Sequence, residues 1–167
     1  MRGFLKRAAP SSGLSATFSL REKGPNAHRR QNKASSVTMS ERITRVGIAI
    51  VEHAGRFLVG VRPEGTPLAG AAEFPGGKCD PDETPSACAE RECLEETGVT
   101  VTAVTSLETR THAYAHGTVE IHFWRCRPVA MPESLLGAFR WVETNKLASL
   151  PFPEANASVI QKLLADR

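Results

Sequence analysis

The sequence has no apolar run long enough to cross a membrane and no pair of cysteines in a C-x-x-C spacing. Because a membrane-spanning helix needs about 20 mostly apolar residues, we expect no membrane partner. The spacing of the four cysteines is atypical of zinc sites and predicts free thiols in a reducing compartment (Cys79, Cys88, Cys93 and Cys126). The chain also lacks the apolar segment of a secretion signal, which favours a cytoplasmic location.

Acidic residues are scarce at the start of the chain. Residues 1–38 carry eight Lys or Arg and one acid, Glu22, for a net charge of +7, whereas residues 39–167 carry thirteen basic and seventeen acidic residues, for −4. We predict a disordered basic extension over residues 1–38 and one folded domain over residues 39–167. Three interpretations of the extension stay open: an organelle transit peptide, a solvated basic tail, or a segment upstream of a true start at Met39.

The net negative charge of the predicted domain bears on its partners. A mildly acidic domain is a poor non-specific binder of nucleic acid polymers, so we expect a small-molecule partner such as a free nucleotide, with a metal ion as the bridge. The sequence leaves a monomer and a homodimer as alternatives.

Hydrophobic periodicity and turn residues predict a mixed α/β domain. Alternating β-branched residues indicate strands over residues 43–51, 56–62, 99–107 and 119–126, with a shorter one over 139–142. Thr84 is a good N-cap, Pro85 suits the first helical position and Gly98 suits the C′ position, so we predict a helix over 85–97. A closing helix is expected over 155–165. This order predicts a mixed β-sheet between helices, an α/β/α sandwich.

The predicted helix 85–97 carries three carboxylates in its second half. Glu92, Glu95 and Glu96 lie within one arc of the helix, where like charges repel by a few tenths of a kcal/mol per pair. Hard oxygen ligands on a rigid element suit Mg²⁺ or Mn²⁺, and such ions usually also hold substrate phosphates. The charges alone leave two interpretations open: a cation site and a solvated acidic helix face.

The run from Gly77 to Val99 resembles the signature of the Nudix hydrolases, G-x5-E-x7-R-E-U-x-E-E-x-G-U, where U is a bulky aliphatic residue. Every glycine and charged position of that pattern is met, and one U position holds Cys93, which packs as a small hydrophobe. The resemblance implies the Nudix fold, an α/β/α sandwich with a mixed β-sheet, and hydrolysis of a diphosphate linkage with Mg²⁺, with Mn²⁺ as the alternative cofactor.

The resemblance also assigns the metal-binding and catalytic residues. Glu92 and Glu96 match direct metal ligands, Glu95 shares that role or acts as the base, and the carbonyl of Gly76 matches a further ligand. An acidic residue past the last long strand completes the site in similar enzymes, and Glu133 is the candidate here, with an ordinary loop glutamate as the alternative.

Other positions that match the family are assigned to bracing and to substrate binding. Glu83 and Arg91 match residues that brace the loop against the helix, and Arg91 also has Glu95 four residues ahead as an ion-pair partner. Arg62, at the end of a strand, is predicted to bind phosphate oxygens, with an edge residue that faces water as the alternative.

Two segments outside the signature are similar to MutT-type members of the family. One is Glu73–Lys78, from which we include Phe74 among the substrate-binding residues. The other is Pro151–Asn156, in which Asn156 matches the residue that reads the purine base. An amide offers a donor and an acceptor to a base edge, although Asn is equally suited to cap the closing helix.

Together these features predict a MutT-type Nudix enzyme that hydrolyses a (deoxy)nucleoside triphosphate to the monophosphate and diphosphate. The most specific form of this prediction is an enzyme that hydrolyses oxidised purine nucleotides such as 8-oxo-dGTP and so removes them from the nucleotide pool. One alternative is another diphosphate substrate, a pyrimidine triphosphate or a dinucleoside polyphosphate. Another is a Nudix module that binds nucleotides without catalysis.

Overall fold

The computed structural model describes residues 43–114 and 117–166. The predicted extension over residues 1–38, and Met39, lie outside this part of the chain. None of the described helices is both long and apolar enough to span a lipid bilayer. The elements, in chain order, are β1 (Ile43–His53), β2 (Arg56–Val61), β3 (Ala72–Glu73), β4 (Gly76–Lys78), α1 (Pro85–Thr97), β5 (Thr100–Tyr114), β6 (Gly117–Ala130), β7 (Arg140–Glu143), the 3₁₀ helices η1 (Thr144–Ser149) and η2 (Glu154–Asn156), and α2 (Ala157–Ala165).

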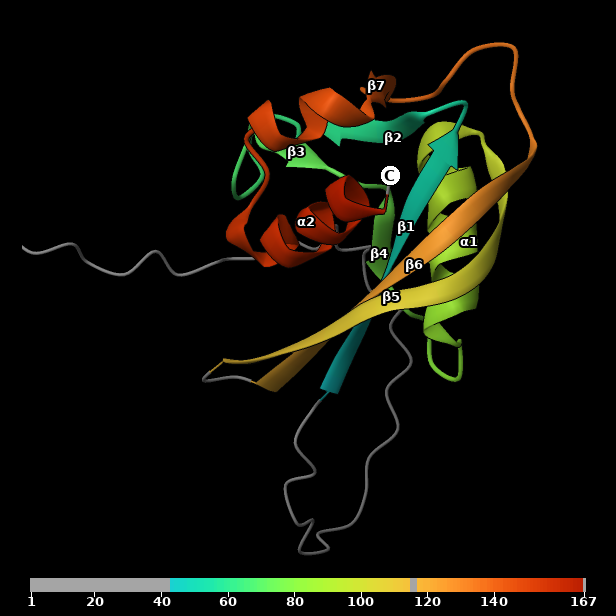
Figure 1. The fold of residues 1–167 in the computed structure, drawn as a ribbon. Helices are drawn as coiled ribbons and strands as arrows, with labels where there is room; N and C mark the ends of the chain where they lie inside the picture. Colours follow the sequence, from blue (N-terminus) through green and yellow to red (C-terminus); the bar gives the residue numbers. More distant parts are fainter. Residues whose placement is uncertain (1–42, 115–116, 167) are drawn as a thin grey trace, which may run out of the picture.

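The strands form one seven-stranded sheet in which β1 lies at the centre. Its main path runs β3-β2-β1-β6-β5, with β4 paired to β1 and β7 paired to β2. The β1–β6 pair is parallel, whereas β1 pairs antiparallel with β2 and with β4. The predicted mixed sheet is therefore confirmed, and the parallel β1–β6 pair joins strands that are separated along the chain by β2–β5 and α1 (Figure 1).

The side chains of β1 alternate between two cores on opposite faces of the sheet, as expected for a strand buried on both sides. Val46, Ile48 and Ile50 belong to a core that also contains Val159, Ile160 and Leu163 of α2. Ala49 and Val51 belong to a second core that contains Ala89 and Cys93 of α1. Because the two helices cover opposite faces, the predicted α/β/α sandwich is confirmed (Figure 1).

Several boundaries differ from the sequence predictions. Strand β5 extends to Tyr114, well past its predicted end, and β6 extends beyond both of its predicted ends, because the antiparallel pairing continues through Ala113↔Thr118 and Thr100↔Ala130. The part of β5 past its predicted end is solvent-exposed and carries no apolar alternation. Helix α2 begins at Ala157 rather than at the predicted residue 155, because Glu154–Asn156 form the 3₁₀ helix η2. Strand β4 falls in a predicted glycine loop and exists because it pairs with Val46–Ile48.

Candidate active site

Helix α1 begins and ends where the sequence predicts. The Thr84 hydroxyl accepts a hydrogen bond from Ala87 N (3.2 Å), and Pro85 opens the helix. Gly98 adopts the left-handed conformation with φ of 76° and donates to Leu94 O (2.9 Å). These two caps fix the position of the helix and hence of the carboxylates on its second half.

The glutamates of α1 reach across to the glycines of β4. Glu96 Oε2 accepts a hydrogen bond from Gly76 N (3.1 Å), across twenty residues of sequence. The Glu92 carboxylate lies over Gly77 so closely that a Cβ atom at Gly77 would fall 2.5–2.7 Å from its atoms. A side chain at Gly77 would therefore have to displace the Glu92 carboxylate. The structure brings together the predicted ligands Gly76, Glu92 and Glu96.

Arg91 binds the loop before α1 to the helix. Its guanidinium donates two hydrogen bonds to the Glu83 carboxylate, from Nε to Oε1 (2.9 Å) and from Nη2 to Oε2 (2.8 Å). It also donates to Glu92 Oε1 (2.6 Å) and to Lys78 O (3.1 Å). The hydrogen bonds from Arg91, together with that from Asp80 N, lower the pKa of Glu83 to about 2.

Glu95, the partner that helical spacing predicts for Arg91, is the more distant one. Its Oε1 lies 3.6 Å from Arg91 Nη1, and its side chain is 46% exposed, against 17% for Glu92. Arg91 therefore lies between the Glu92 and Glu95 carboxylates. The Glu95 carboxylate is the more solvent-exposed of these two.

Glu133 lies in the exposed segment after β6. Its neighbours Pro132 and Leu136 pack near Gly98, and Leu136 N donates to Thr97 O (3.0 Å), so the segment passes the carboxyl end of α1. The predicted role of Glu133 as a metal ligand stays a prediction.

The three predicted substrate-binding residues line one small cleft beside Gly76. Its walls are formed by Ile48, Arg62, Ala72, Glu73, Phe74, Gly76, Pro153 and Asn156. Phe74 is buried and stacks on Phe152, with 4.8 Å between ring centroids. A larger hollow of about 300 Å³ lies beside β7 and η1, and its lining includes none of the predicted site residues.

Asn156 immediately precedes α2, but its side chain makes no capping hydrogen bond to the helix. Its Nδ2 donates weakly to Pro153 O (3.4 Å). The alternative explanation of this residue, a side-chain cap on the closing helix, is therefore not observed. The amide is held at the wall of the cleft.

Arg62 has partners within the protein. Its Nε donates to Pro67 O (3.0 Å), and its Nη1 lies 3.6 Å from Glu73 Oε2. Sequence reasoning did not identify Glu73 as a cleft residue, although it directly precedes Phe74. Any phosphate bound by Arg62 competes with the Glu73 carboxylate.

The donor set on α1 and β4 fits a hard divalent cation. It consists of carboxylate oxygens and backbone groups, which Mg²⁺ and Mn²⁺ prefer, and it contains no thiol or imidazole. The neighbouring cleft is lined by an aromatic ring and an amide, which suit a nucleobase. The arrangement places carboxylates that could hold a cation beside a small cleft of about 40 Å³.

Comparisons with known proteins agree with this arrangement. The family model of the NUDIX domain matches residues 46–162. The chain is 32% identical over 129 residues to an 8-oxo-dGTP diphosphatase of Haemophilus influenzae, covering 75% of this chain and 95% of that protein. It is 31% identical over 83 residues to a CTP pyrophosphohydrolase of Escherichia coli, covering 50% of this chain and 62% of that protein.

A solved structure extends the comparison to the fold. The solution structure of the MutT protein of methicillin-resistant Staphylococcus aureus, a Nudix hydrolase, superposes with a TM-score of 0.62 at 25% identity and covers 76% of this chain and 99% of that one. Sequence, fold and site geometry lead to one assignment: the chain belongs to the NUDIX domain family, as a MutT-type member.

Proposed function

We propose that the protein is a Mg²⁺-dependent nucleoside triphosphate diphosphatase that acts on oxidised purine nucleotides such as 8-oxo-dGTP. One observation carries the proposal. Gly76 bonds to Glu96 on one side and lines the Asn156 cleft on the other, so it joins the cation site to the base site. The Haemophilus influenzae relative is named an 8-oxo-dGTP diphosphatase, and the alignment covers 95% of that protein. This name supports the same substrate.

Glu92, Glu96 and the carbonyl of Gly76 would hold the divalent cation, with Glu95 and Glu133 as further candidates. The cation, when bound, neutralises phosphate oxygens and makes water more acidic. Glu95, the exposed carboxylate, takes the proton of the attacking water or shares the cation. Water attacks the β-phosphorus, the bond from that phosphorus to the α–β bridging oxygen breaks, and the monophosphate and diphosphate leave.

The cleft residues orient the base. The Asn156 amide offers both a donor and an acceptor, which allows it to pair with a purine edge that carries an added oxo group. Phe74 supplies an apolar wall that is already fixed by its stacking on Phe152. The Glu83–Arg91 pair contacts neither base nor phosphate in this proposal; it keeps Glu92 in place.

A second candidate substrate is a pyrimidine triphosphate, because the Escherichia coli relative is named a CTP pyrophosphohydrolase, although that alignment covers only half of the chain. The test is diphosphate release from a panel containing 8-oxo-dGTP, the normal dNTPs, CTP and a diadenosine polyphosphate, with Mg²⁺ and with chelator. A kcat/KM for 8-oxo-dGTP well above that for dGTP supports the proposal. A higher value for CTP, or a flat profile, overturns the oxidised-purine substrate.

A further inference from the structure

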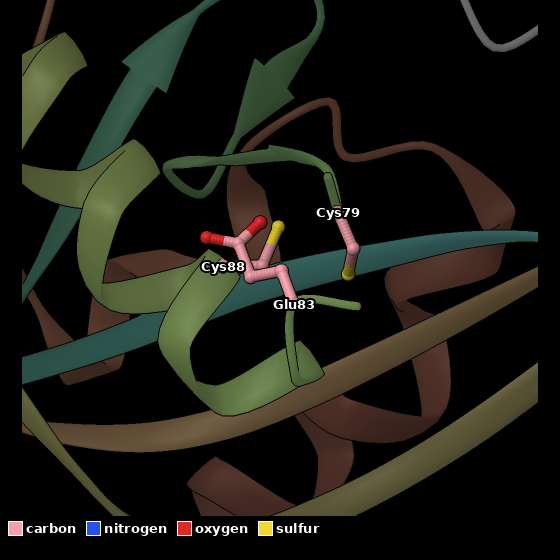
Figure 2. A group of neighbouring side chains, drawn as sticks. All are labelled: Cys79, Glu83 and Cys88. Atoms are coloured by element: carbon pink, nitrogen blue, oxygen red, sulfur yellow. The ribbon is translucent and has the colours of Figure 1, made fainter. Parts of the chain in front are cut away.

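Two thiols and a carboxylate lie close together between the end of β4 and the first turns of α1. One ligand atom from each of Cys79, Glu83 and Cys88 lies within 4.8 Å of the other two (Figure 2). Among the residues that the structure describes, no second group of three such side chains meets this limit. The cluster includes neither Glu92 nor Glu96, so it is separate from the oxygen site described above.

The fold brings these three residues together, although their spacing in the sequence does not predict a metal site. Cys79 follows β4 and is anchored by a hydrogen bond from its N–H to Arg45 O (2.9 Å). Glu83 precedes the helix, and Cys88 lies in its first turns with no exposed surface and with its Sγ 3.3 Å from Gly77 O. The nine-residue separation of the cysteines lacks a C-x-x-C pattern, which explains why the sequence predicted only free thiols.

We propose that Cys79, Glu83 and Cys88 form a second metal site, for a thiophilic divalent cation of the Zn²⁺ class. Two sulfur ligands and one carboxylate are a donor set that Zn²⁺ accepts in tetrahedral geometry, whereas Mg²⁺ prefers oxygen alone. The site goes beyond the proposed hydrolysis, which requires only the oxygen ligands of α1 and β4.

A bound cation would change the protonation and the net charge of the cluster. Burial raises the pKa of both thiols, so each is protonated at neutral pH in the metal-free protein. Binding therefore forms two metal–sulfur bonds and releases two protons to solvent. Two thiolates and Glu83 carry one negative charge more than a divalent ion neutralises. Arg91, with Nη2 3.7 Å from Cys88 Sγ, supplies the compensating positive charge.

The three protein ligands leave one tetrahedral position for a water molecule or for Asp80. Asp80 is close, since its N–H donates to Glu83 Oε2 (2.8 Å) and its exposed carboxylate lies 4.0 Å from Arg91 Nε. Glu83 has two carboxylate oxygens, so one can bind the ion while the other keeps a hydrogen bond from Arg91. An ion held in this way ties the loop after β4 to α1.

The experiment is a titration of the full-length protein with Co²⁺, a spectroscopic substitute for Zn²⁺, in excess Mg²⁺ and a phosphine reductant. Excess Mg²⁺ occupies the carboxylates of α1, and only thiolate ligands give a sulfur-to-cobalt charge-transfer band. We expect this band to saturate at one equivalent of Co²⁺ and to disappear when Zn²⁺ is added. Absence of the band overturns the proposal.

Three variants locate the site. Cys79→Ser and Cys88→Ala are each expected to reduce the band at least tenfold, whereas Cys126→Ala, which removes another buried thiol, leaves it unchanged. Cys79 is only partly buried, so its variant is expected to fold even if Cys88→Ala does not. A full-strength band in Cys79→Ser, or loss of the band in Cys126→Ala, overturns the assignment. The readout does not depend on nucleotide hydrolysis, so its failure leaves the proposed function standing.

Discussion

Glu96 accepts a hydrogen bond from the backbone N–H of Gly76 at 3.1 Å, and this contact joins the helix of the Nudix signature to the central strands. The two residues belong to α1 and β4, which pack on β1 from different directions (Figure 1). The oxygen that accepts this bond is Oε2 of Glu96. The contact therefore fixes a ligand in position before any metal binds.

Replacing Glu96 with Gln tests this arrangement. The amide keeps the shape of the side chain, but it carries no charge to stabilise the cation, so kcat is expected to fall by a factor of about 10² or more. Diphosphate release in Mg²⁺ measures the effect. Glu64→Gln, at an exposed loop position, is the matched control and is expected to keep full activity. Near-normal turnover by Glu96→Gln contradicts the assignment of Glu96 as a ligand.

Replacing Arg91 with Lys tests the paired hydrogen bonds between Arg91 and Glu83. Lysine cannot make the paired hydrogen bonds to Glu83, and losing charge-assisted bonds in this partly buried place is expected to lower the free energy of unfolding by about 1–3 kcal/mol. Urea denaturation measures the change. Arg127→Lys, on an exposed part of β6, is the control and should leave the urea midpoint in place. An equal effect of the two substitutions would show that the paired geometry is unimportant.

Because the pKa of Glu83 is low, the contribution of the Glu83–Arg91 pair to the free energy of unfolding depends on pH. The pKa falls from an ordinary value of 4.5 to about 2 in the folded protein, so this carboxylate stabilises the fold above about pH 4.5, and the stabilisation is lost as the pH falls toward 2. The wild-type free energy of unfolding is therefore expected to drop more steeply than that of Glu83→Gln between about pH 5 and pH 3. Urea titrations of both proteins at several pH values measure the two slopes. Parallel slopes contradict the prediction.

Helix α1 shows which features could be predicted from the sequence and which could not. Both of its ends were predicted, because Thr84, Pro85 and Gly98 each act through local backbone geometry. Two arguments predicted partners for Arg91: helical spacing indicated Glu95, four residues ahead, and the family resemblance indicated Glu83, eight residues before it. The shorter contacts go to Glu83. That choice depends on the path of the loop, which local rules do not fix.

Contacts between remote segments account for the features that were missed. Strand β4 contains two glycines, and its sequence does not predict a strand. Its pairing with β1 nevertheless positions Gly76 and Gly77 against the carboxylates of α1. Likewise, Glu73 became a cleft residue only through its proximity to Arg62, and Cys79 and Cys88 meet only because the loop folds back on the helix. Residue types at fixed spacing predicted the carboxylates, but tertiary pairing decided their neighbours.

Replacing Asn156 with Ala separates base recognition from phosphate chemistry. The amide lines the cleft and makes no capping bond to α2, so its removal is expected to leave the fold intact. If the amide pairs with the oxo-purine edge, the kcat/KM preference for 8-oxo-dGTP over dGTP is expected to fall by about tenfold or more, since a lost hydrogen bond to a buried partner costs about 1–3 kcal/mol.

The same panel of nucleotides supplies the internal comparison for this variant. Turnover of poor substrates should be preserved in Asn156→Ala, because Glu92 and Glu96 are untouched and the cation site does not involve the amide. Asn145→Ala, at an exposed position in η1, is the matched control for the loss of an amide and should keep the wild-type preference. An unchanged preference in Asn156→Ala would mean that the base is selected elsewhere in the cleft, with the ring of Phe74 as the next residue to substitute.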